Sequence, residues 1–471
     1  MKKRFLAIFL VLAMVVGSLV ACGNKDDEPA DKNVSNQDKD NEQDDGGNDV
    51  SDVEEEEEVP ENEVVGDADA EDAFYVYGWN TDVQNNVLKY FAEFYPEDAK
   101  RIVFVNTGGT DFYQSKIDAL LEDPNNKQYP DMFAMEMDYI MKYTDSDYTL
   151  PVSECGITEA DLSEMYEYTI QAATVDGVLK GLSWQACPGA MMYRRDLAEK
   201  YLGVSEPEEV QEFFKDWDTM LETGKMILEK SGGATKLFSG VDDVKRVYQA
   251  GRTHAWYDDN NKIVVDDVML DYMDYAKQLF DLGLTNNTSQ WSDEWNANVK
   301  SDNTFAYMGC TWFLHWTIKA NAGDAETGTY GKWGMCAGPQ SYYWGGTWLG
   351  VGKDCSDKEL AGKILKALCD KDVMKAICKG SLDYVNHKAA IAELSAEGEG
   401  AYDFLAGQDF LAYFSPLAEA IELPAMCGED LQITNAFDNQ VNEFVNGNKD
   451  KDKAIEDFKS AVTDLYPYLS K

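Results

Sequence analysis

From residue 73 onward the chain alternates short apolar runs with segments that carry apolar residues at helical spacing. Residues 74–77, 101–105 and 130–135 have the length and apolar character of buried strands. Residues 83–94 and 113–121 repeat apolar side chains every three or four positions, which predicts helices. A strand, helix, strand order predicts a parallel sheet with right-handed crossovers. We therefore expect an α/β fold.

Residues 174–196 mark a passage from one compact body to another. Asp176-Gly177 lies between apolar flanks and predicts a tight hairpin turn, because glycine tolerates the positive φ that such a turn needs. A second extended run ends at Trp184, and Pro188 then interrupts the chain before another apolar run leads into a helical pattern. We expect the chain to cross between two lobes here.

The same alternation continues to the C-terminus. Apolar residues at helical spacing predict further helices, and continuous apolar runs predict further strands. The predicted helices are 210–228, 270–282, 356–371, pieces of 404–422, and two at 441–445 and 455–465 joined by a turn in 446–457. The predicted strands are 305–312, 333–337 and 343–351.

The first residues have the organisation of an export signal. Three basic residues precede an apolar run over 5–16, which is too short for a spanning helix, and small residues follow. The end of this segment, Leu19-Val20-Ala21-Cys22, resembles a lipobox, and that resemblance implies acylation of Cys22. An ordinary secretory signal with an incidental cysteine is the alternative.

Residues 23–72 are dominated by acidic side chains. They hold 22 acidic residues against three lysines, a net charge of −19, and no aromatic residue. Such a segment cannot bury a core, so we expect a disordered, extended tether. Calcium buffering or docking of a partner is the alternative role for this segment.

Charge and cysteine content narrow the possible partners. The whole chain has a net charge of −46, which disfavours nucleic acid and leaves cationic ligands open. The eight cysteines after Cys22 are scattered and include no Cys-x-x-Cys pair. They are either disulfide-bonded in a pattern that the sequence does not reveal or small buried apolar residues.

Catalytic and metal-binding signatures are absent from the sequence. There is no Gly-x-Ser-x-Gly elbow and no phosphate-binding loop, and the three histidines are far apart. The Asp- and Asn-rich segment 446–457 lacks the glycine and final glutamate of a calcium loop. We expect no enzyme activity, no cofactor and no metal. The alternative function is a surface glycoside hydrolase that acts through a pair of carboxylates.

The order of several short motifs resembles a known family. Asp176-Gly177, Lys180-Gly181-Leu182, Met192-Tyr193 and Asp196-Leu197 are similar to the crossover of the extracellular solute-binding proteins, family 1, with Ser183-Trp184 and Arg194 as departures from the family pattern. Residues 305–312 and 343–351 resemble two later strands of those sugar-binding lipoproteins, which serve ABC importers.

That resemblance implies a two-lobed α/β fold of the type II periplasmic-binding-protein kind, anchored by lipid on the extracellular face of the membrane as a monomer. Each lobe is then discontinuous in sequence, with connecting strands near 185–189 and 338–341. The implied divisions are a signal peptide at 1–22, a tether at 23–72, lobe 1 at 73–186 with 341–395, and lobe 2 at 187–340 with 396–471.

A ligand site is predicted where aromatic residues follow strands. In open α/β sheets ligands bind beyond the carboxyl ends of the strands. Sugars lie on aromatic rings while their hydroxyl groups bond to polar side chains. The predicted ligand-binding residues are Trp79, Asn80, Asp111, Glu136, Asp138, Trp184, Arg194, Trp312, Trp344 and Gly345.

Each of these residues also has a simpler interpretation. The tryptophans are otherwise core residues, and Glu136 with Asp138 is otherwise a pair at a helix N-terminus. The predicted function is capture of an oligosaccharide for an ABC permease. A polyamine or peptide-like solute is the alternative ligand, and sensing for a membrane kinase is the alternative output.

Overall fold

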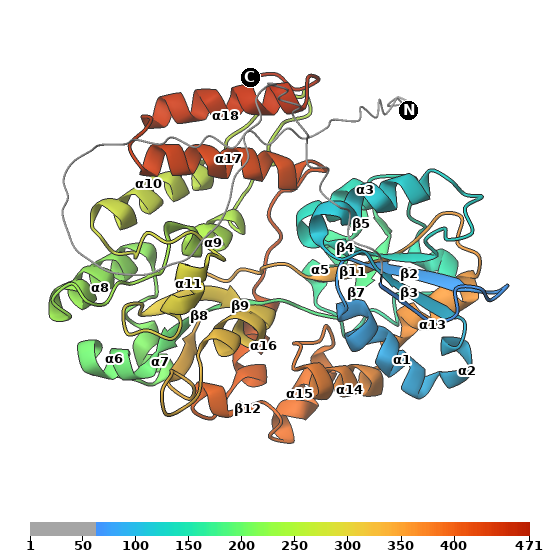
Figure 1. The fold of residues 1–471 in the computed structure, drawn as a ribbon, viewed down its shortest axis with the longest axis horizontal. Coiled ribbons are helices and arrows are strands. Elements are labelled where there is room, and N and C mark those ends of the chain that lie inside the picture. The colour runs from blue at the N-terminus through green and yellow to red at the C-terminus, as the bar shows by residue number, and fades with distance from the viewer. Residues whose placement is uncertain (1–62) are drawn as a thin grey trace, which may run out of the picture. The chain divides into compact units, whose positions relative to one another are not determined.

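The computed structural model describes residues 63–471, with the side chains of Thr110 and Asp111 left out. The predicted signal peptide, the lipid attachment at Cys22 and the tether up to residue 62 lie outside the described residues. The described chain contains two main sheets (Figure 1). One apolar core surrounds the six-stranded sheet and continues onto one side of the three-stranded sheet, as at Met192, and a second core covers its other side, as at Met191. We call the six-stranded sheet with its helices lobe 1 and the three-stranded sheet with its helices lobe 2.

The sheet of lobe 1 has the order β1-β3-β2-β4-β11-β7. The predicted parallel pairing is confirmed, because β2 runs parallel to both β3 and β4. β11 returns late in the sequence and pairs antiparallel with both β4 and β7. The strands are β1 Glu63–Val65, β2 Phe74–Gly78, β3 Ile102–Asn106, β4 Met132–Glu136, β7 Gly181–Ser183 and β11 Thr347–Val351.

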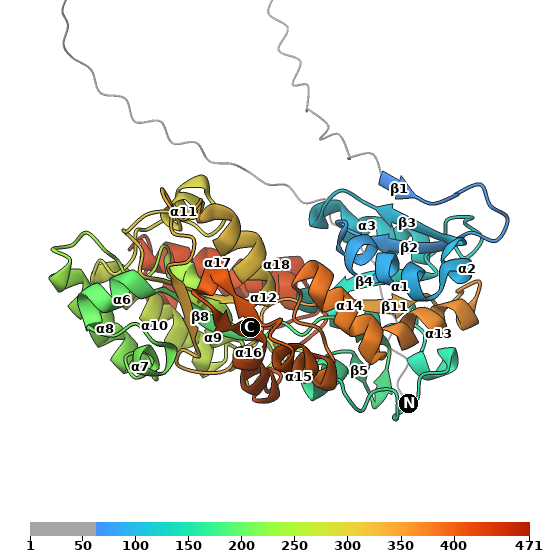
Figure 2. The same ribbon diagram turned by 90° about the horizontal axis from the view of Figure 1, so that it is seen from below.

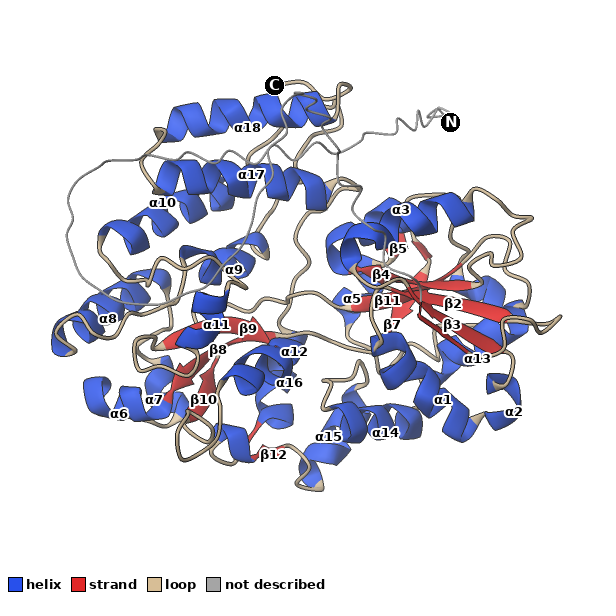
Figure 3. Ribbon diagram, in the orientation of Figure 1, coloured by secondary structure: helices blue, strands red, loops and turns tan. Residues whose placement is uncertain are grey.

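Helical segments enclose this sheet (Figure 3). They are η1 Gln84–Leu88, α1 Lys89–Phe94, α2 Pro96–Ala99, α3 Thr110–Leu121, η2 Met137–Tyr139, α4 Ile140–Thr144, η3 Val152–Cys155, α5 Glu167–Ala172, α13 Lys358–Ala367, α14 Lys371–Ser381 and α15 Lys388–Ala396.

The sheet begins earlier than the sequence indicates. β1 lies inside the segment predicted as an acidic tether, and Val64 and Val65 pair antiparallel with Val105 and Phe104 of β3. All three β1 residues are exposed, so the strand is held by its backbone pairing and contributes little to the core. Composition cannot reveal such a strand.

Lobe 2 is built on an antiparallel sheet of order β10-β8-β9. Its strands are β8 Gly189–Arg194, β9 Ala306–Cys310 and β10 Trp333–Cys336. The helical segments that follow these strands are α6 Arg195–Leu202, α7 Pro207–Gln211, α8 Trp217–Lys230, η4 Val241–Val244, α9 Lys245–Gln249, α10 Asp267–Asp281, α11 Asp293–Asn298, α12 Thr311–Phe313, η5 Leu314–Lys319, η6 Asp403–Leu405, α16 Phe410–Glu419, α17 Asp430–Val445 and α18 Lys451–Leu465.

The predicted helix at 210–228 is two helices in the structure. α7 ends at Gln211, and α8 begins after Asp216, whose carboxylate accepts a hydrogen bond from the Thr219 backbone nitrogen at 2.7 Å. A capping carboxylate satisfies a helix N-terminus and so favours a new start there. The apolar spacing continues across the break, which is why periodicity alone joined the two.

The chain passes between the lobes three times: from β7 to β8, from β10 to β11, and from α15 to η6. The first two of these passages lie side by side. β7 ends at Ser183 and β8 begins at Gly189, while β10 and β11 are joined by residues 337–346. The segments touch where Pro188 pairs with Tyr343, and any side chain at Gly189 would collide with the Tyr342 ring. Figure 2 shows the elements of the two lobes staying on separate sides in a second view.

The predicted hairpin before this passage is confirmed. β5 Thr174–Val175 pairs antiparallel with β6 Val178–Leu179, and both turn residues have positive φ, 51° at Asp176 and 76° at Gly177. Two successive positive φ values define the tight hairpin turn that Asp-Gly favours.

Candidate functional site

Four aromatic residues gather where β9 and the segment before β11 end. Trp312 is the second residue of α12, which follows β9 directly, and its Nε1 donates a hydrogen bond to the Trp344 carbonyl oxygen at 2.9 Å. The ring centroids of Trp312 and Trp344 lie 5.2 Å apart, and Phe313 packs against both. With Trp291 these residues form what we call the aromatic cluster. The sequence prediction brought Trp312 and Trp344 to one site, and the structure places them in contact.

Trp291 is a member that the sequence prediction missed. Its ring stacks on Trp312 with centroids 6.2 Å apart and lies 5.7 Å from Trp344, yet 48% of the residue is exposed. Its φ is 72°, a left-handed conformation that is an outlier for a bulky aromatic residue. Such strain concentrates at ligand sites. The available signal was a lone tryptophan in the polar loop 286–292.

An ion pair joins the lobes beside this cluster. Asp138, just after β4 of lobe 1, accepts two hydrogen bonds from Arg246 of α9 in lobe 2, both at 2.6 Å. Arg246 also lies over the Trp344 ring, 5.5 Å from its centroid. Burial by itself raises the pKa of Asp138, but the Arg246 guanidinium outweighs it and holds that pKa below its usual value. Asp138 is therefore an anion that one lobe presents to the other.

Glu136 and Gly345 lie next to this pair. The Glu136 carboxylate accepts a hydrogen bond from the Asp138 backbone nitrogen at 2.6 Å, so it caps η2 as the simpler interpretation expected. Burial, and then the neighbouring Asp138 charge, raise the pKa of Glu136. A side chain on Gly345, whose φ is 70°, would begin 3.1 Å from Trp312 Nε1 and 3.5 Å from Glu136 Oε1. Glycine at this position lets the backbone approach both groups.

A cavity continues from Asp138 and Gly345 along α9. Its volume is about 70 Å³, and it is partly open to solvent. Three of its lining residues have a buried polar atom without a hydrogen-bond partner in the described structure. These atoms are Arg246 Nε, Gln249 Oε1 and Arg252 Nε. Native proteins satisfy nearly all buried polar atoms, so these two donors and one acceptor need water or a ligand. The lining residues are Met137, Asp138, Lys245, Arg246, Gln249, Ala250, Arg252, Tyr343, Gly345, Pro424, Met426, Asp430, Leu431, Thr434 and Asn435.

Each cation of the cavity has its own anion. Arg252 makes two hydrogen bonds to Asp430, at 3.0 and 2.9 Å, and Lys245 lies 2.7 Å from Asp438. Because these charges are already matched, the cavity offers little net field to an ionic ligand. A hydroxyl group, which both donates and accepts, fits the unpartnered atoms. No residue of α9 was predicted, since its charges look like an ordinary solvated face in the sequence.

Trp79 and Asn80 lie at the carboxyl end of β2, beside β4. Trp79 is half-buried and packs edge-on against Tyr113 and Tyr139, at centroid distances of 5.3 and 6.2 Å. The Asn80 side chain donates to Asp82 at 2.8 Å. They share the sheet edge with Glu136 but have no recorded contact with the aromatic cluster. Asp111 lies at the start of α3, and its side chain is outside the described structure.

Trp184 does not face the cleft. It is fully buried, and its Nε1 donates to the Asp383 carboxylate at 3.1 Å, where Asn86 also donates. Burial raises the pKa of Asp383 to about 6. The pattern placed Trp184 at a strand end, but the chain continues inward there, and the tryptophan fills the interior of lobe 1.

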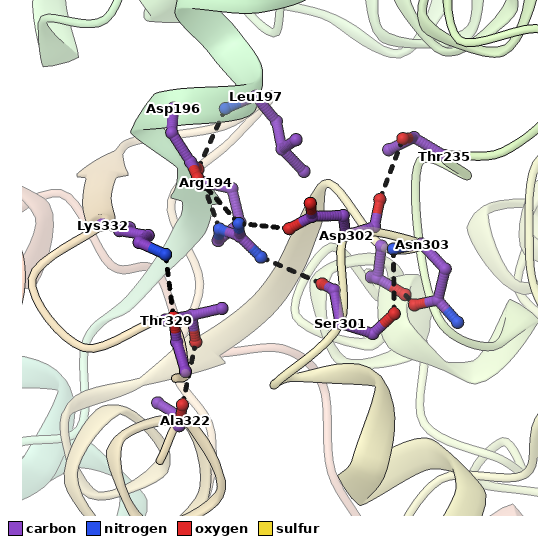
Figure 4. A network of polar contacts seen from close by, with 12 residues as sticks. Arg194, Asp196, Leu197, Thr235, Ser301, Asp302, Asn303, Ala322, Thr329 and Lys332 are labelled. Carbon is purple, nitrogen blue, oxygen red and sulfur yellow. Dashed lines mark hydrogen bonds and ion pairs between the residues drawn. The ribbon is translucent and has the colours of Figure 1, made fainter. Parts of the chain in front are cut away.

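Arg194 is also a structural residue. Only 1% of it is exposed, and it donates hydrogen bonds to Asp196, Asp302 and the Ser301 carbonyl oxygen (Figure 4). The chain enters lobe 2 at Gly189, the first residue of β8, and Arg194 is the last residue of the same strand. Its network ties the loop before β9 to the start of α6, and four of its five N–H donors are used within this network.

Three further properties of the described residues bear on function. No group of three or more His, Cys, Asp or Glu side chains within 63–471 is arranged to hold a metal ion. The eight cysteines in this range are free thiols, and most are buried. Across the same residues, every helix is too short or too polar to cross a bilayer.

Comparison with known proteins identifies what the chain is similar to. Residues 89–399 match a family described as bacterial extracellular solute-binding protein. No curated protein matches the chain.

Solved structures resemble it over most of its length. A crystal structure of an extracellular solute-binding protein family 1 has a TM-score of 0.71 and 19% identity, covering 82% of this chain and 97% of its own. The lacto-N-biose complex of a binding protein from Bifidobacterium longum has a TM-score of 0.64 and 15% identity, covering 84% and 98%. A binding protein from B. animalis subsp. lactis with beta-1,6-galactobiose has a TM-score of 0.62 and 17% identity, covering 84% and 97%. At these identities the likeness shows the two-lobed fold.

Proposed function

The chain belongs to the bacterial extracellular solute-binding proteins, and from this premise we propose that it captures a carbohydrate between its lobes and delivers it to an ABC importer. The observation that carries the proposal is the pairing of the aromatic cluster with the charge-matched cavity along α9. A sugar lays its C–H face on an indole and turns hydroxyl groups to donors and acceptors such as Arg246 Nε and Gln249 Oε1.

Binding works through closure of the lobes. The cluster belongs to lobe 2 and the connecting segment, while Glu136 and Asp138 belong to lobe 1. A ligand that contacts both sides favours the closed arrangement by its differential affinity for it. The Asp138–Arg246 pair supplies part of the same contact without ligand. The closed form is the one presented to the permease.

The solved relatives support a sugar over a cation. Two of them are complexes with disaccharides, lacto-N-biose and beta-1,6-galactobiose. In this chain the cavity's cations, Lys245, Arg246 and Arg252, are each paired with a carboxylate, so the cavity offers a polyamine little net field. An oligosaccharide is therefore the proposed ligand.

We extend the proposal to location and division of the chain. Cys22 carries the lipid that holds the protein outside the membrane as a monomer, with lobe 1 at 73–186 and 341–395 and lobe 2 at 187–340 and 396–471. Two lipid signals or several acyl chains give durable anchoring. In cell fractionation, Cys22→Ala moves the protein from the membrane to the medium, and its retention in the membrane contradicts the anchor.

The test of binding is a thermal-shift screen of the purified protein. Its probes are maltose, maltotriose, lacto-N-biose, beta-1,6-galactobiose, spermidine and a tripeptide. A ligand that binds only the folded state raises the melting temperature by mass action. A shift with one class of sugar supports the proposal, a shift with spermidine alone replaces it with a polyamine site, and no shift with any sugar refutes it.

One observation favours a second function, a glycoside hydrolase. The pKa of Glu136 is raised and that of neighbouring Asp138 is lowered, which is the division between acid and anion that such enzymes use. Against it, both carboxylate oxygens of Asp138 accept hydrogen bonds from Arg246, so neither is free to attack a sugar carbon while this ion pair is formed. Chromatography of each sugar after prolonged incubation decides the point, since cleavage appears only in the hydrolase.

A further inference from the structure

One strongly exposed tryptophan, Trp316, lies outside the aromatic cluster. The chain has eleven tryptophans, all within the described residues, and nine are buried or half-buried. The two exposed ones are Trp291, at 48%, and Trp316, at 65%. Trp291 stacks on Trp312 in the aromatic cluster. Trp316 is the most exposed of the large apolar side chains and takes no part in the cluster as defined.

Trp316 follows Trp312 by one turn of the same helix. α12 runs directly into η5, and the two tryptophans are four residues apart, which puts them on one face about 6 Å apart along the axis. The neighbouring positions turn inward: Leu314 and Ile318 are buried, and His315 packs against aromatic rings of the core. Trp316 thus extends the face that Trp312 begins.

The backbone at this point is unusual as well. η5, Leu314–Lys319, is a π-helix, a geometry that is rare and often occurs at functional sites. Trp316 lies within this π-helix and is 65% exposed. Figures 2 and 3 show α12 on the side of lobe 2 that faces lobe 1. The helix therefore begins at the aromatic cluster on that side of the lobe.

We propose that Trp316 is an outer stacking platform for a further sugar ring, so that the ligand is an oligosaccharide longer than a disaccharide. This inference rests on the proposed function, because the inner rings occupy the aromatic cluster and the cavity along α9. An indole left largely in water gains most when a flat apolar face covers it, and the next ring of a bound chain is already held nearby. The one-turn spacing is of the order of the distance between neighbouring rings in an oligosaccharide.

The experiment measures affinity against ligand length. Isothermal titration calorimetry of the purified protein uses maltose, maltotriose and maltotetraose, and in parallel beta-1,6-galactobiose and beta-1,6-galactotriose. The wild-type protein gains about tenfold in affinity, 1.4 kcal/mol, on passing from the disaccharide to the longer members of the series that it binds. Trp316→Ala abolishes that gain and leaves the disaccharide unchanged, while Trp316→Phe keeps part of it. Phe94→Ala, an exposed aromatic residue of α1 in lobe 1, serves as the matched control and changes neither.

Each other outcome overturns the inference. A wild-type protein that binds disaccharides with no gain for longer sugars refutes the outer platform and leaves the proposed function intact. A gain that survives Trp316→Ala assigns Trp316 to another role, such as contact with the permease. An equal loss for short and long sugars places Trp316 in the inner site. Binding of no sugar at all refutes the proposed function and this inference with it.

Discussion

Replacing Asp138 by asparagine tests the ion pair with Arg246, the contact that joins the two lobes when no ligand is bound. The substitution keeps the shape of the side chain but removes its charge and one of the two acceptors that Arg246 uses at 2.6 Å. Both side chains are about a quarter exposed, 24% for Arg246 and 25% for Asp138. Exposed ion pairs contribute up to about 1 kcal/mol and breaking a buried pair costs about 3–5 kcal/mol, so we expect about 2 kcal/mol here.

That energy bears on opening of the lobes because the pair spans them. About 2 kcal/mol corresponds to roughly a 30-fold shift toward the open arrangement. Small-angle X-ray scattering of the ligand-free protein is the assay, and Asp138→Asn increases the radius of gyration relative to wild type. Saturating sugar restores the wild-type value, because bound ligand adds its own contacts between the lobes.

A pair of similar burial within lobe 2 provides the control. Lys245 and Asp438 lie 2.7 Å apart with exposed fractions of 18% and 19%, and both belong to lobe 2. Asp438→Asn lowers the free energy of unfolding by a similar amount but leaves the scattering curve unchanged. If Asp138→Asn also leaves it unchanged, or if Asp438→Asn opens the protein equally, the inter-lobe reasoning is wrong.

Three further predictions test residues with different roles. Trp312→Ala weakens sugar binding about 100-fold in calorimetry while changing the ligand-free stability by only about 1 kcal/mol, and a collapse of stability would instead mark it as core. Arg194→Met leaves Asp196 and Asp302 without their partner, so it lowers the free energy of unfolding in urea by about 2 kcal/mol. Sugar affinity stays unchanged, and a selective loss of affinity would show that Arg194 contacts the ligand. Asp383 has a pKa of about 6 in the folded protein, above its unfolded value, so the folded state binds this proton more tightly. Its contribution to stability is therefore lost as pH rises from about 4 to 6, by about 3 kcal/mol, and Asp383→Asn flattens the denaturation free energy over that window.

How far the site could be predicted depended on the kind of residue. Trp312, Trp344 and Gly345 were predicted because each lies near the end of a predicted strand, and strand ends meet at one edge of a sheet. Trp184 has the same local pattern but points into lobe 1, since the direction taken after a strand depends on what packs there. Arg194 resembled a ligand-binding residue only because its partners Asp302 and Ser301 come more than a hundred positions later.

The sequence by itself determined the alternation of strands and helices, the passage at 174–196 and the family, because apolar periodicity and turn residues act locally. The tertiary structure alone decided that Arg246 meets Asp138 across 108 positions, that α9 lines a cavity, and that Trp291 joins Trp312. The physical reason is that charges and exposed rings acquire a role only from neighbours, and those neighbours belong to segments that the fold brings together. In the sequence alone, each of these charged and aromatic residues is indistinguishable from a residue on a solvated surface.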